Sequence, residues 1–466
     1  MTITPPAATD AAVVAKTLRT TFESGRTRPL AWRKAQIAGL RRMMVEGEDE
    51  LVEALRVDLA RPRTEAYAAD IGHTKTELRH MDKHVAKWMK ATRVRPGMNV
   101  APARAWVQPE PLGVTLVIAP WNYPIQLLVE PLAISLAAGN CVAVKPSEMT
   151  PSCSAALARL LPRYVDPEAV IVVEGGVDET TALLAERWDH IFFTGSTAVG
   201  RVVAEAAAKH LTPTTLELGG KSPTYVHASA DLDGAARRIV WGKFFNAGQT
   251  CIAPDYVLAD SSIRDGLVDR MAKEIGQFYG ADPKASASLG RIVNDRHLAR
   301  LQRLLDAGAG TIAVGGQSDP ATRYLAPTIT LDPSPESPVM QEEIFGPILP
   351  VLTVEGPDEA KAFITARPKP LALYVFAGND EVIDSVVDDV SSGGVCINQT
   401  LMHLIPADLP FGGVGESGMG SYHGKAGFDA FSHRKSVLRK PTKPDLKLLY
   451  PPYKPRIEKI VKRIIR

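Results

Sequence analysis

Cysteine is scarce in this sequence, with only four among 466 residues, all far apart. Such sparse cysteines argue against a disulfide framework and favour a reducing, cytoplasmic location. Residues 1–10 lack a basic stretch followed by an apolar one, so we expect no secretory signal. An excess of one charge is lacking too, because 54 Lys and Arg nearly balance 52 Asp and Glu. The resulting net charge of +2 gives no reason to expect a nucleic-acid partner.

Long uninterrupted apolar runs are also missing. The most apolar stretch, 114–144, is broken by several prolines and by Glu130, so it does not predict a membrane span. Metal-ligand spacing is limited to His80 and His84, which lie four residues apart on a predicted helix. No further Cys or His cluster completes a site in the sequence, so we expect no metal.

The length of the chain predicts two or three domains. Residues 10–94 have a helical pattern, and 95–112 change to Pro, Gly and alternating residues, as in a short hairpin. Apolar runs then alternate with helical patterns, which predicts a doubly wound parallel sheet in an α/β fold. A second α/β region is expected over 221–419. The strands of the first sheet are predicted at 114–119, 141–145, 169–174, 190–194 and 214–218.

Two motifs enclose a predicted helix between residues 215 and 252. An apolar run ends in Glu217 and two glycines, as a strand does at a tight turn, and Gly248-Gln249-Thr250-Cys251 follows the helix. One such unit could bring a carboxylate base and a sulfur nucleophile to the same cleft. Taken alone, Cys251 would be read as a buried packing residue and Glu217 as a solvated or capping one. The helix before Cys251 directs its negative end toward the sulfur and should not lower the thiol pKa.

A glycine-containing segment, Gly195 to Gly200, follows the predicted fourth strand. It is not G-x-G-x-x-G, because Ser196-Thr197 replaces the second glycine, and Arg201 replaces the Lys of a P-loop. A helix N-terminus here could still bind phosphate through free N–H groups. An ordinary Ser-capped helix start explains the segment equally well.

Taken together and in this order, these segments resemble the NAD(P)-dependent aldehyde dehydrogenase superfamily. The residues 248–256 and 418–425 are most similar to its class 3 (fatty-type) branch. The resemblance implies a cofactor domain, a second α/β catalytic domain and an oligomerisation hairpin. The matching segments are the Asn122 loop, 145–148, 193–200, 217–220, 248–251, 343–347 and 410–413.

The resemblance also implies roles for individual residues. Cys251 would attack the aldehyde, the Asn122 amide and the Cys251 N–H would hold the oxyanion, and Glu217 would activate the water that hydrolyses the thioester. The implied cofactor is NAD; Glu148 disfavours a 2′-phosphate by charge, although this branch often accepts NADP as well. The implied cofactor-binding residues are Pro120, Trp121, Lys145, Glu148, Gly195, Ser196, Gly200, Glu343 and Phe345. Analogy places Tyr123, Ile252, Thr400 and Leu401 in the substrate pocket, whose apolar character favours medium- or long-chain aliphatic or aromatic aldehydes.

The same resemblance gives the expected organisation. Residues 1–97 and 111–218 form the NAD(P)-binding domain, and 219–422 form the catalytic domain. The segments 98–110 and 432–440 are expected to contact a partner subunit, which implies a homodimer.

Three other interpretations fit the sequence less well. A CoA-acylating aldehyde dehydrogenase would release the thioester to a thiol, but such members tend to lack a base at the position of Glu217. A thiol esterase or protease normally pairs its cysteine with a histidine, and none of the ten histidines is near Cys251 in sequence. An inactive structural homologue is disfavoured because Asn122, Glu217 and Cys251 are all present.

The basic tail, 443–466, carries one apolar stripe at helical spacing, with Lys and Arg on the remaining surface. The stripe consists of Ile457, Ile460, Val461, Ile464 and Ile465. A helix that packs on its own body or on a partner subunit explains this pattern. Reversible attachment to an anionic membrane, at the inner face, is the alternative.

Overall fold

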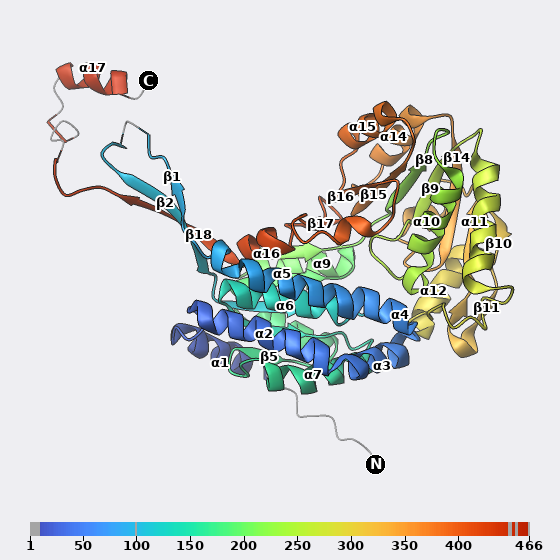
Figure 1. Cartoon of the computed structure of the whole chain (residues 1–466), viewed down its shortest axis with the longest axis horizontal. Coiled ribbons are helices and arrows are strands. Elements are labelled where there is room, and N and C mark those ends of the chain that lie inside the picture. Colours follow the sequence, from blue (N-terminus) through green and yellow to red (C-terminus); the bar gives the residue numbers. More distant parts are fainter. Residues whose placement is uncertain (1–9, 98–99, 446–449, 453–454, 465–466) are drawn as a thin grey trace, which may run out of the picture.

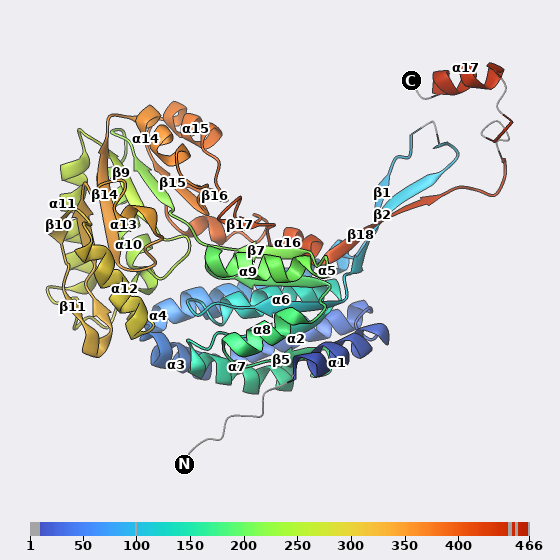
Figure 2. The ribbon, with the colours of Figure 1, turned by 180° about the vertical axis from the view of Figure 1, so that it is seen from behind.

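The computed structural model describes residues 10–97, 100–445, 450–452 and 455–464. Two α/β bodies lie side by side, and a small sheet projects from one of them (Figure 1). The view from behind shows the same arrangement, with the base of the sheet next to α5 and α16 and its outer end away from both bodies (Figure 2). Residues 1–9, where no secretory signal is expected, lie outside the described part.

The N-terminal region is helical, as its sequence pattern predicts. Helix α1 begins at Asp10, whose side chain accepts the Ala12 N–H, a typical N-cap. Acidic residues fill the first turn of α3, where they complement the helix dipole. The helices are α1 (Ala11–Glu23), α2 (Leu30–Glu46), α3 (Glu48–Leu59), α4 (Arg63–Glu65), the π-helical η1 (Ala66–Gly72) and α5 (His73–Trp88).

The first sheet has the strand order β17-β7-β6-β3-β4-β5. Its strands are parallel, except for the short β17 at the β7 edge, so the predicted parallel sheet is confirmed. Strands β3, β4 and β6 are buried at every residue, which explains their apolar runs. The strands are β3 (Val114–Ile118), β4 (Cys141–Lys145), β5 (Val170–Val172), β6 (His190–Thr194), β7 (Thr214–Glu217) and β17 (Gly418–Met419). The connecting helices are α6 (Gln126–Ala138), α7 (Pro151–Tyr164), α8 (Val177–Ala185) and α9 (Thr197–Ala208).

The second sheet has the order β10-β13-β14-β9-β8-β15-β16 and is parallel except for β10. Its strands are β8 (Pro223–Val226), β9 (Tyr256–Asp260), β10 (Thr311–Val314), β13 (Thr328–Leu331), β14 (Ile348–Val354), β15 (Ala372–Phe376) and β16 (Gly394–Ile397). Its longer helices are α10 (Leu232–Phe244), α11 (Arg264–Tyr279), α12 (Asp295–Asp306), α14 (Pro357–Thr365) and α15 (Asp380–Asp389). Shorter elements are η3 (Phe245–Gly248), β11 (Ser318–Asp319), η4 (Pro320–Thr322), β12 (Tyr324–Leu325), α13 (Pro338–Gln341) and η5 (Met402–Leu404).

The projecting sheet joins segments from both ends of the chain. Its strands are β1 (Thr92–Val94), β2 (Arg104–Pro111) and β18 (Ser432–Arg439), in the antiparallel order β1-β2-β18. Helix α16 (Gly424–Ala430) leads into β18. Residues 104–110 and 432–439 of the two segments that we expect at a subunit interface therefore lie on paired strands, whereas residues 98 and 99 are outside the described part.

The C-terminal helix α17 (Pro455–Ile464) lies beyond the projecting sheet, apart from both bodies in the two views (Figures 1 and 2). Lys462 and Glu458 form an ion pair of 2.6 Å on this helix. Ile465, the last residue of the predicted stripe, and Arg466 lie outside the described residues. Over the described ranges, no helix is both long and apolar enough to span a membrane.

Candidate active site

Glu217 ends strand β7 and points into the protein interior. Its side chain is almost completely buried, and within the described chain neither carboxylate oxygen has a hydrogen-bond partner. Burial raises its pKa well above the usual range of a carboxyl group. Gly418 of β17 pairs directly with Glu217 and closes this edge of the sheet. The isolated carboxyl is thus in a setting that favours proton transfer.

The chain reaches Cys251 through a tight turn after helix α10. Asn246, Ala247 and Gly248 adopt left-handed conformations, with φ of 53°, 53° and 76°. A Cβ atom at Gly248 would lie 2.3 Å from the backbone oxygen of Gly346. Glycine is therefore required at position 248 for steric reasons as well as for its φ angle.

The thiol of Cys251 lies in an environment that disfavours the thiolate. Burial raises its pKa to about 12, and the carboxylates of Glu343 and Glu217 act in the same direction. The backbone N–H groups of Cys251 and Ile252 oppose this effect only partly. Cys251 and Glu217 are therefore close enough to interact, and the thiol is protonated at neutral pH in this state.

Asn122 lies in the loop after β3 and is bonded to the loop that carries Cys251. Its Nδ2 donates to the backbone oxygen of Gln249 at 3.1 Å, and its own backbone oxygen accepts from Asn246 Nδ2 at 3.1 Å. Gln249 is held in turn by Val293, whose N–H donates to Gln249 Oε1 at 2.9 Å. The structure thus brings together the three residues expected to be catalytic: Cys251, Glu217 and Asn122.

A buried ion pair behind this loop was missed by the sequence analysis. Arg61 and Asp70 are both inaccessible to solvent, and Arg61 also donates to the backbone oxygen of Asn122 and, at 3.1 Å, to Asn246 Oδ1. Asp70 accepts the backbone N–H of Gln126 at 3.0 Å. The N-terminal helices therefore hold the Asn122 loop in place. Only the Arg61-Pro62 helix break marked this position in the sequence.

The residues expected to bind the adenosine part of a cofactor lie where strands of the first sheet end. Lys145 ends β4, and its Nζ donates to Glu148 Oε2 at 2.8 Å. Ser196 caps α9 by accepting the Val199 N–H at 3.4 Å. The segment is therefore a Ser-capped helix start, one of the two explanations that the sequence left open. A Cβ at Gly200 would lie 2.5 Å from Leu218, which gives that glycine a packing role.

Glu343 reaches this region from the second body. A Cβ at Gly219 would lie 2.1 Å from Glu343 Oε2, so the carboxylate packs directly on the turn after Glu217. Burial, followed by the charge of Asp255, raises the Glu343 pKa to about 8, and its Oε1 has no partner among the described residues. Glu343 and Gly219 line a cleft of about 180 Å³ between the two bodies.

Phe345, two residues after Glu343, packs edge-on against the ring of Trp121, with the ring centroids 5.2 Å apart. Pro120 directly precedes Trp121 in the same loop.

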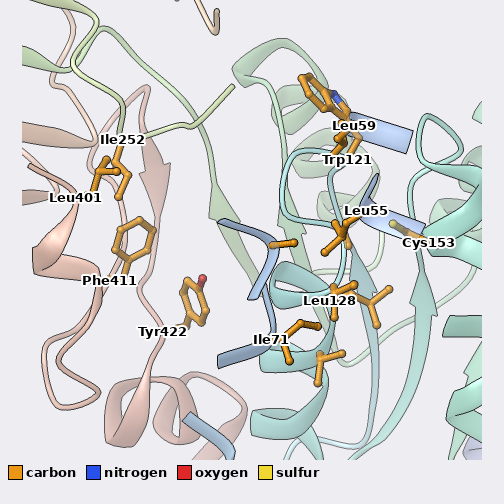
Figure 3. Close-up of a cluster of buried hydrophobic side chains, with 14 of the residues drawn as sticks. Leu55, Leu59, Ile71, Trp121, Leu128, Cys153, Ile252, Leu401, Phe411 and Tyr422 are labelled. Carbon is orange, nitrogen blue, oxygen red and sulfur yellow. The ribbon is translucent and has the colours of Figure 1, made fainter. Parts of the chain in front are cut away.

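The expected pocket residues differ in their surroundings. The Tyr123 and Thr250 hydroxyls are hydrogen-bonded at 2.6 Å. The Thr400 hydroxyl instead donates to the backbone oxygen of Arg238 in α10 at 2.7 Å. Ile252 and Leu401 are buried side chains of one apolar wall. Figure 3 shows them next to Phe411 and Tyr422, which the sequence analysis did not select.

One further ionisable group near the site was also missed. Lys243 of α10 is fully buried, and its Nζ has no hydrogen-bond partner in the described chain. Burial lowers its pKa to about 8. In the sequence it reads as a polar position of an amphipathic helix, so its pattern gives no signal of burial.

Comparisons with known proteins agree with this geometry. The aldehyde dehydrogenase family matches residues 2–437. Aldehyde dehydrogenase family 3 member A2 of Rattus norvegicus is 50% identical over 437 residues, which cover 93% of this chain and 90% of the relative. The protein named "Aldehyde dehydrogenase, dimeric NADP-preferring" of Canis lupus familiaris is 47% identical over 441 residues, covering 94% and 97%. A substrate-bound structure of Staphylococcus aureus AldH has a TM-score of 0.95 at 42% identity and covers 98% of this chain and 99% of its own. The chain belongs to the aldehyde dehydrogenase family, in its class 3 branch.

Proposed function

We propose that this enzyme oxidises an aldehyde to the carboxylic acid with Cys251 as nucleophile, Glu217 as general base and NAD(P) as hydride acceptor. One observation carries the assignment of roles. The buried carboxyl of Glu217, which has no hydrogen-bond partner among the described residues, lies within electrostatic range of the Cys251 thiol, and the two groups come from different bodies. A carboxyl held in this way is free to take a proton from water.

The residues around the cleft fit a dinucleotide. Beside Gly219, Glu343 Oε1 has no hydrogen-bond partner in the part of the chain that the structure describes, so it could accept a hydroxyl of the cofactor. Lys145 and Glu148 stand at the end of β4 and would hold the adenosine ribose, and the N-terminus of α9, at Gly195 and Ser196, would lie near the phosphates. When bound, NAD(P) accepts the hydride. The charge of Glu148 favours NAD over NADP, and the ratio of the two KM values measures that preference.

The chemistry of the chain follows in order. The sulfur of Cys251 loses its proton and forms a bond to the aldehyde carbon, and the developing oxyanion accepts the second Asn122 amide hydrogen and the Cys251 N–H. Hydride departs from that carbon, leaving a thioester on Cys251. Glu217 takes a proton from water, the water oxygen attacks the thioester carbon, and the thiolate leaves. Aldehyde, NAD(P)⁺ and water give acid, NAD(P)H and a proton.

Two other outcomes for the thioester or the cysteine have less support. Release to CoA does not need the buried base Glu217. A thiol esterase needs an imidazole beside the sulfur, whereas the charged side chains that shift the Cys251 pKa are both carboxylates. The decisive experiment follows NAD(P)H formation from a panel of aldehydes with and without CoA. Equal amounts of acid and NAD(P)H without CoA are expected; a requirement for CoA would overturn the hydrolytic assignment.

The substrate class and the assembly extend this proposal. The apolar wall of Ile252, Leu401 and Phe411 suits medium- or long-chain aliphatic or aromatic aldehydes, so kcat/KM should rise with chain length. The half-buried strand β2 and the largely exposed strand β18 would form the contact of a homodimer, which light scattering on the eluted protein can test.

A second proposal concerns α17, which we infer attaches the enzyme reversibly to an anionic membrane surface at the inner face. Its separation from both bodies supports this over packing on its own body (Figure 1). Lys459 and Lys462 are exposed, and basic residues near such a surface contribute about 1 kcal/mol each.

A further inference from the structure

Three side chains that aldehyde oxidation does not use meet inside the first body. They are His73 at the start of α5, Glu130 in α6, and His423 immediately before α16. His73 Nε2 lies 3.6 Å from Glu130 Oε1, and His423 Nε2 lies 3.8 Å from Glu130 Oε2. All three residues are buried, with exposed fractions of 6%, 0% and 1%.

The polar atoms of this cluster are poorly satisfied. Among the described residues, His73 Nε2 and both ring nitrogens of His423 have no hydrogen-bond partner. Glu130 accepts only long hydrogen bonds, from Thr74 at 3.4 Å and Gln126 at 3.5 Å. Separations of 3.6 and 3.8 Å between Glu130 and the imidazoles are too long for hydrogen bonds. Buried polar groups that lack hydrogen bonds destabilise a fold, and a ligand bound between these side chains would satisfy them.

The donor atoms suit a cation. A neutral imidazole keeps a lone pair on one ring nitrogen, and among the described residues nothing else engages His73 Nε2 or either nitrogen of His423. Glu77 is also completely buried, and neither of its oxygens has a hydrogen-bond partner in the described part of the chain. A divalent cation would balance the negative charge of a carboxylate in this interior.

We propose that His73, Glu130 and His423 form a structural site for a divalent transition-metal ion of the zinc type. Two imidazoles and a carboxylate are a donor set that zinc commonly takes. Ligands bonded at about 2.1 Å around a tetrahedral centre lie about 3.4 Å apart. The two imidazole–carboxylate separations, each to a different Glu130 oxygen, exceed this by a few tenths of an ångström, and the three donor atoms all lie within 4.8 Å of one another. The side chains would therefore close in on a bound ion, and a water molecule would supply the fourth ligand.

Such an ion would connect three parts of the chain. It joins α5 and α6 to the segment that leads through α16 into the projecting sheet. His423 has a φ of 75°, which is rare for a residue with a side chain and is sustained only when the surroundings hold it. Tyr422, which directly precedes His423, contributes to the apolar wall seen in Figure 3. This site is distinct from the pair His80 and His84 considered in the sequence. Sequence spacing could not reveal it, because its three ligands come from distant segments of the chain.

The test is metal content and cobalt spectroscopy of the full-length protein, purified without a metal-affinity step. Protein made in zinc-supplemented medium and dialysed should retain about one zinc per chain, and cobalt-loaded protein should show the visible bands of a tetrahedral centre. His73→Gln and His423→Gln should lower metal affinity by more than about 100-fold. These variants retain a similar side-chain shape, and circular dichroism checks that they fold.

The matched control is the half-buried pair His80 and His84, whose ring centroids are 4.2 Å apart on the same α5 helix. The double variant His80→Gln/His84→Gln should keep its metal. Loss of metal in this control with retention in His73→Gln would assign the ion to the His80–His84 pair and overturn the proposal. A folded wild-type protein that takes up no more zinc or cobalt than His73→Gln would overturn it too. Neither result depends on aldehyde turnover.

Discussion

The side-chain amide of Asn122 donates to the backbone oxygen of Gln249 at 3.1 Å, two residues before Cys251. One amide hydrogen therefore fixes the loop after β3 to the loop that carries the thiol, and the other remains for the oxyanion. The same Gln249 oxygen accepts Asn246 Nδ2 at 3.1 Å. The donor is thus placed by a buried network before any substrate arrives.

The first prediction follows from this placement. Asn122→Ala should lower kcat by about 10² to 10³, the usual effect of losing an oxyanion donor. Steady-state kinetics with a saturating aldehyde measures it. Asn246→Ala is the matched control, since it disturbs the same network without removing the donor, and its loss should be smaller. An Asn122→Ala enzyme with unchanged kcat would show that backbone N–H groups hold the oxyanion alone.

The second prediction concerns the nucleophile. Cys251→Ser should abolish dehydrogenase turnover and leave cofactor binding nearly intact, because a hydroxyl is a far poorer nucleophile than a thiolate. Turnover is followed by NADH absorbance and binding by calorimetry. Cys153→Ser is the control, because Cys153 is fully buried in the core and has no part in the chemistry (Figure 3). Near wild-type NADH production by Cys251→Ser would remove Cys251 from the mechanism.

The third prediction concerns the base. Glu217→Gln should bind aldehyde and cofactor but turn over about 10² to 10⁴ times more slowly, with a burst of NADH before a slow steady state. A slowed burst would mean that Glu217 also activates Cys251. Because the base must be ionised and burial raises its pKa, wild-type kcat should increase with pH as Glu217 loses its proton. The Gln variant should lack that rise, and an identical pH profile would assign the base elsewhere.

The fourth prediction concerns Glu65, which accepts the Asn246 N–H at 3.0 Å. Burial raises its pKa from 4.5 to about 7, so the folded protein binds more protons than the unfolded chain between these values. This group therefore contributes a free energy of unfolding that falls as pH rises from 4.5 toward 7. Glu65→Gln keeps the acceptor and should flatten that dependence in urea unfolding measured across the range. The exposed Glu23→Gln should leave it unchanged, and equal slopes for all three proteins would contradict the raised pKa.

The sequence predicted those parts of the site whose signal is local. Val114–Ile118 is predicted as a buried strand because four of its five residues are apolar, and Glu217 and Cys251 are recognisable because each chemically reactive side chain lies close to glycines. The role of Arg61 could not be found in this way, since the two site loops that it holds, at Asn122 and Asn246, lie 61 and 185 residues further along the chain. Phe411 and Tyr422 look like ordinary core aromatics, and their place on the apolar wall depends on how a long loop folds back. Likewise, only tertiary structure could show that the short β17 joins the first sheet.

The last prediction concerns the tail. Helix α17 has only ten residues, and an isolated helix of that length is marginal in water, so its apolar stripe needs a surface to cover it. If that surface is an anionic membrane, full-length protein should co-sediment with anionic liposomes, and a chain ending at Tyr450 should not. Binding should weaken with added salt, because the attraction of Lys459 and Lys462 to the lipid headgroups is screened. Neutral liposomes are the control, since the stripe alone should bind them only weakly. If both chains sediment alike and the shorter one melts at a lower temperature, the stripe instead packs on protein, on this subunit or its partner.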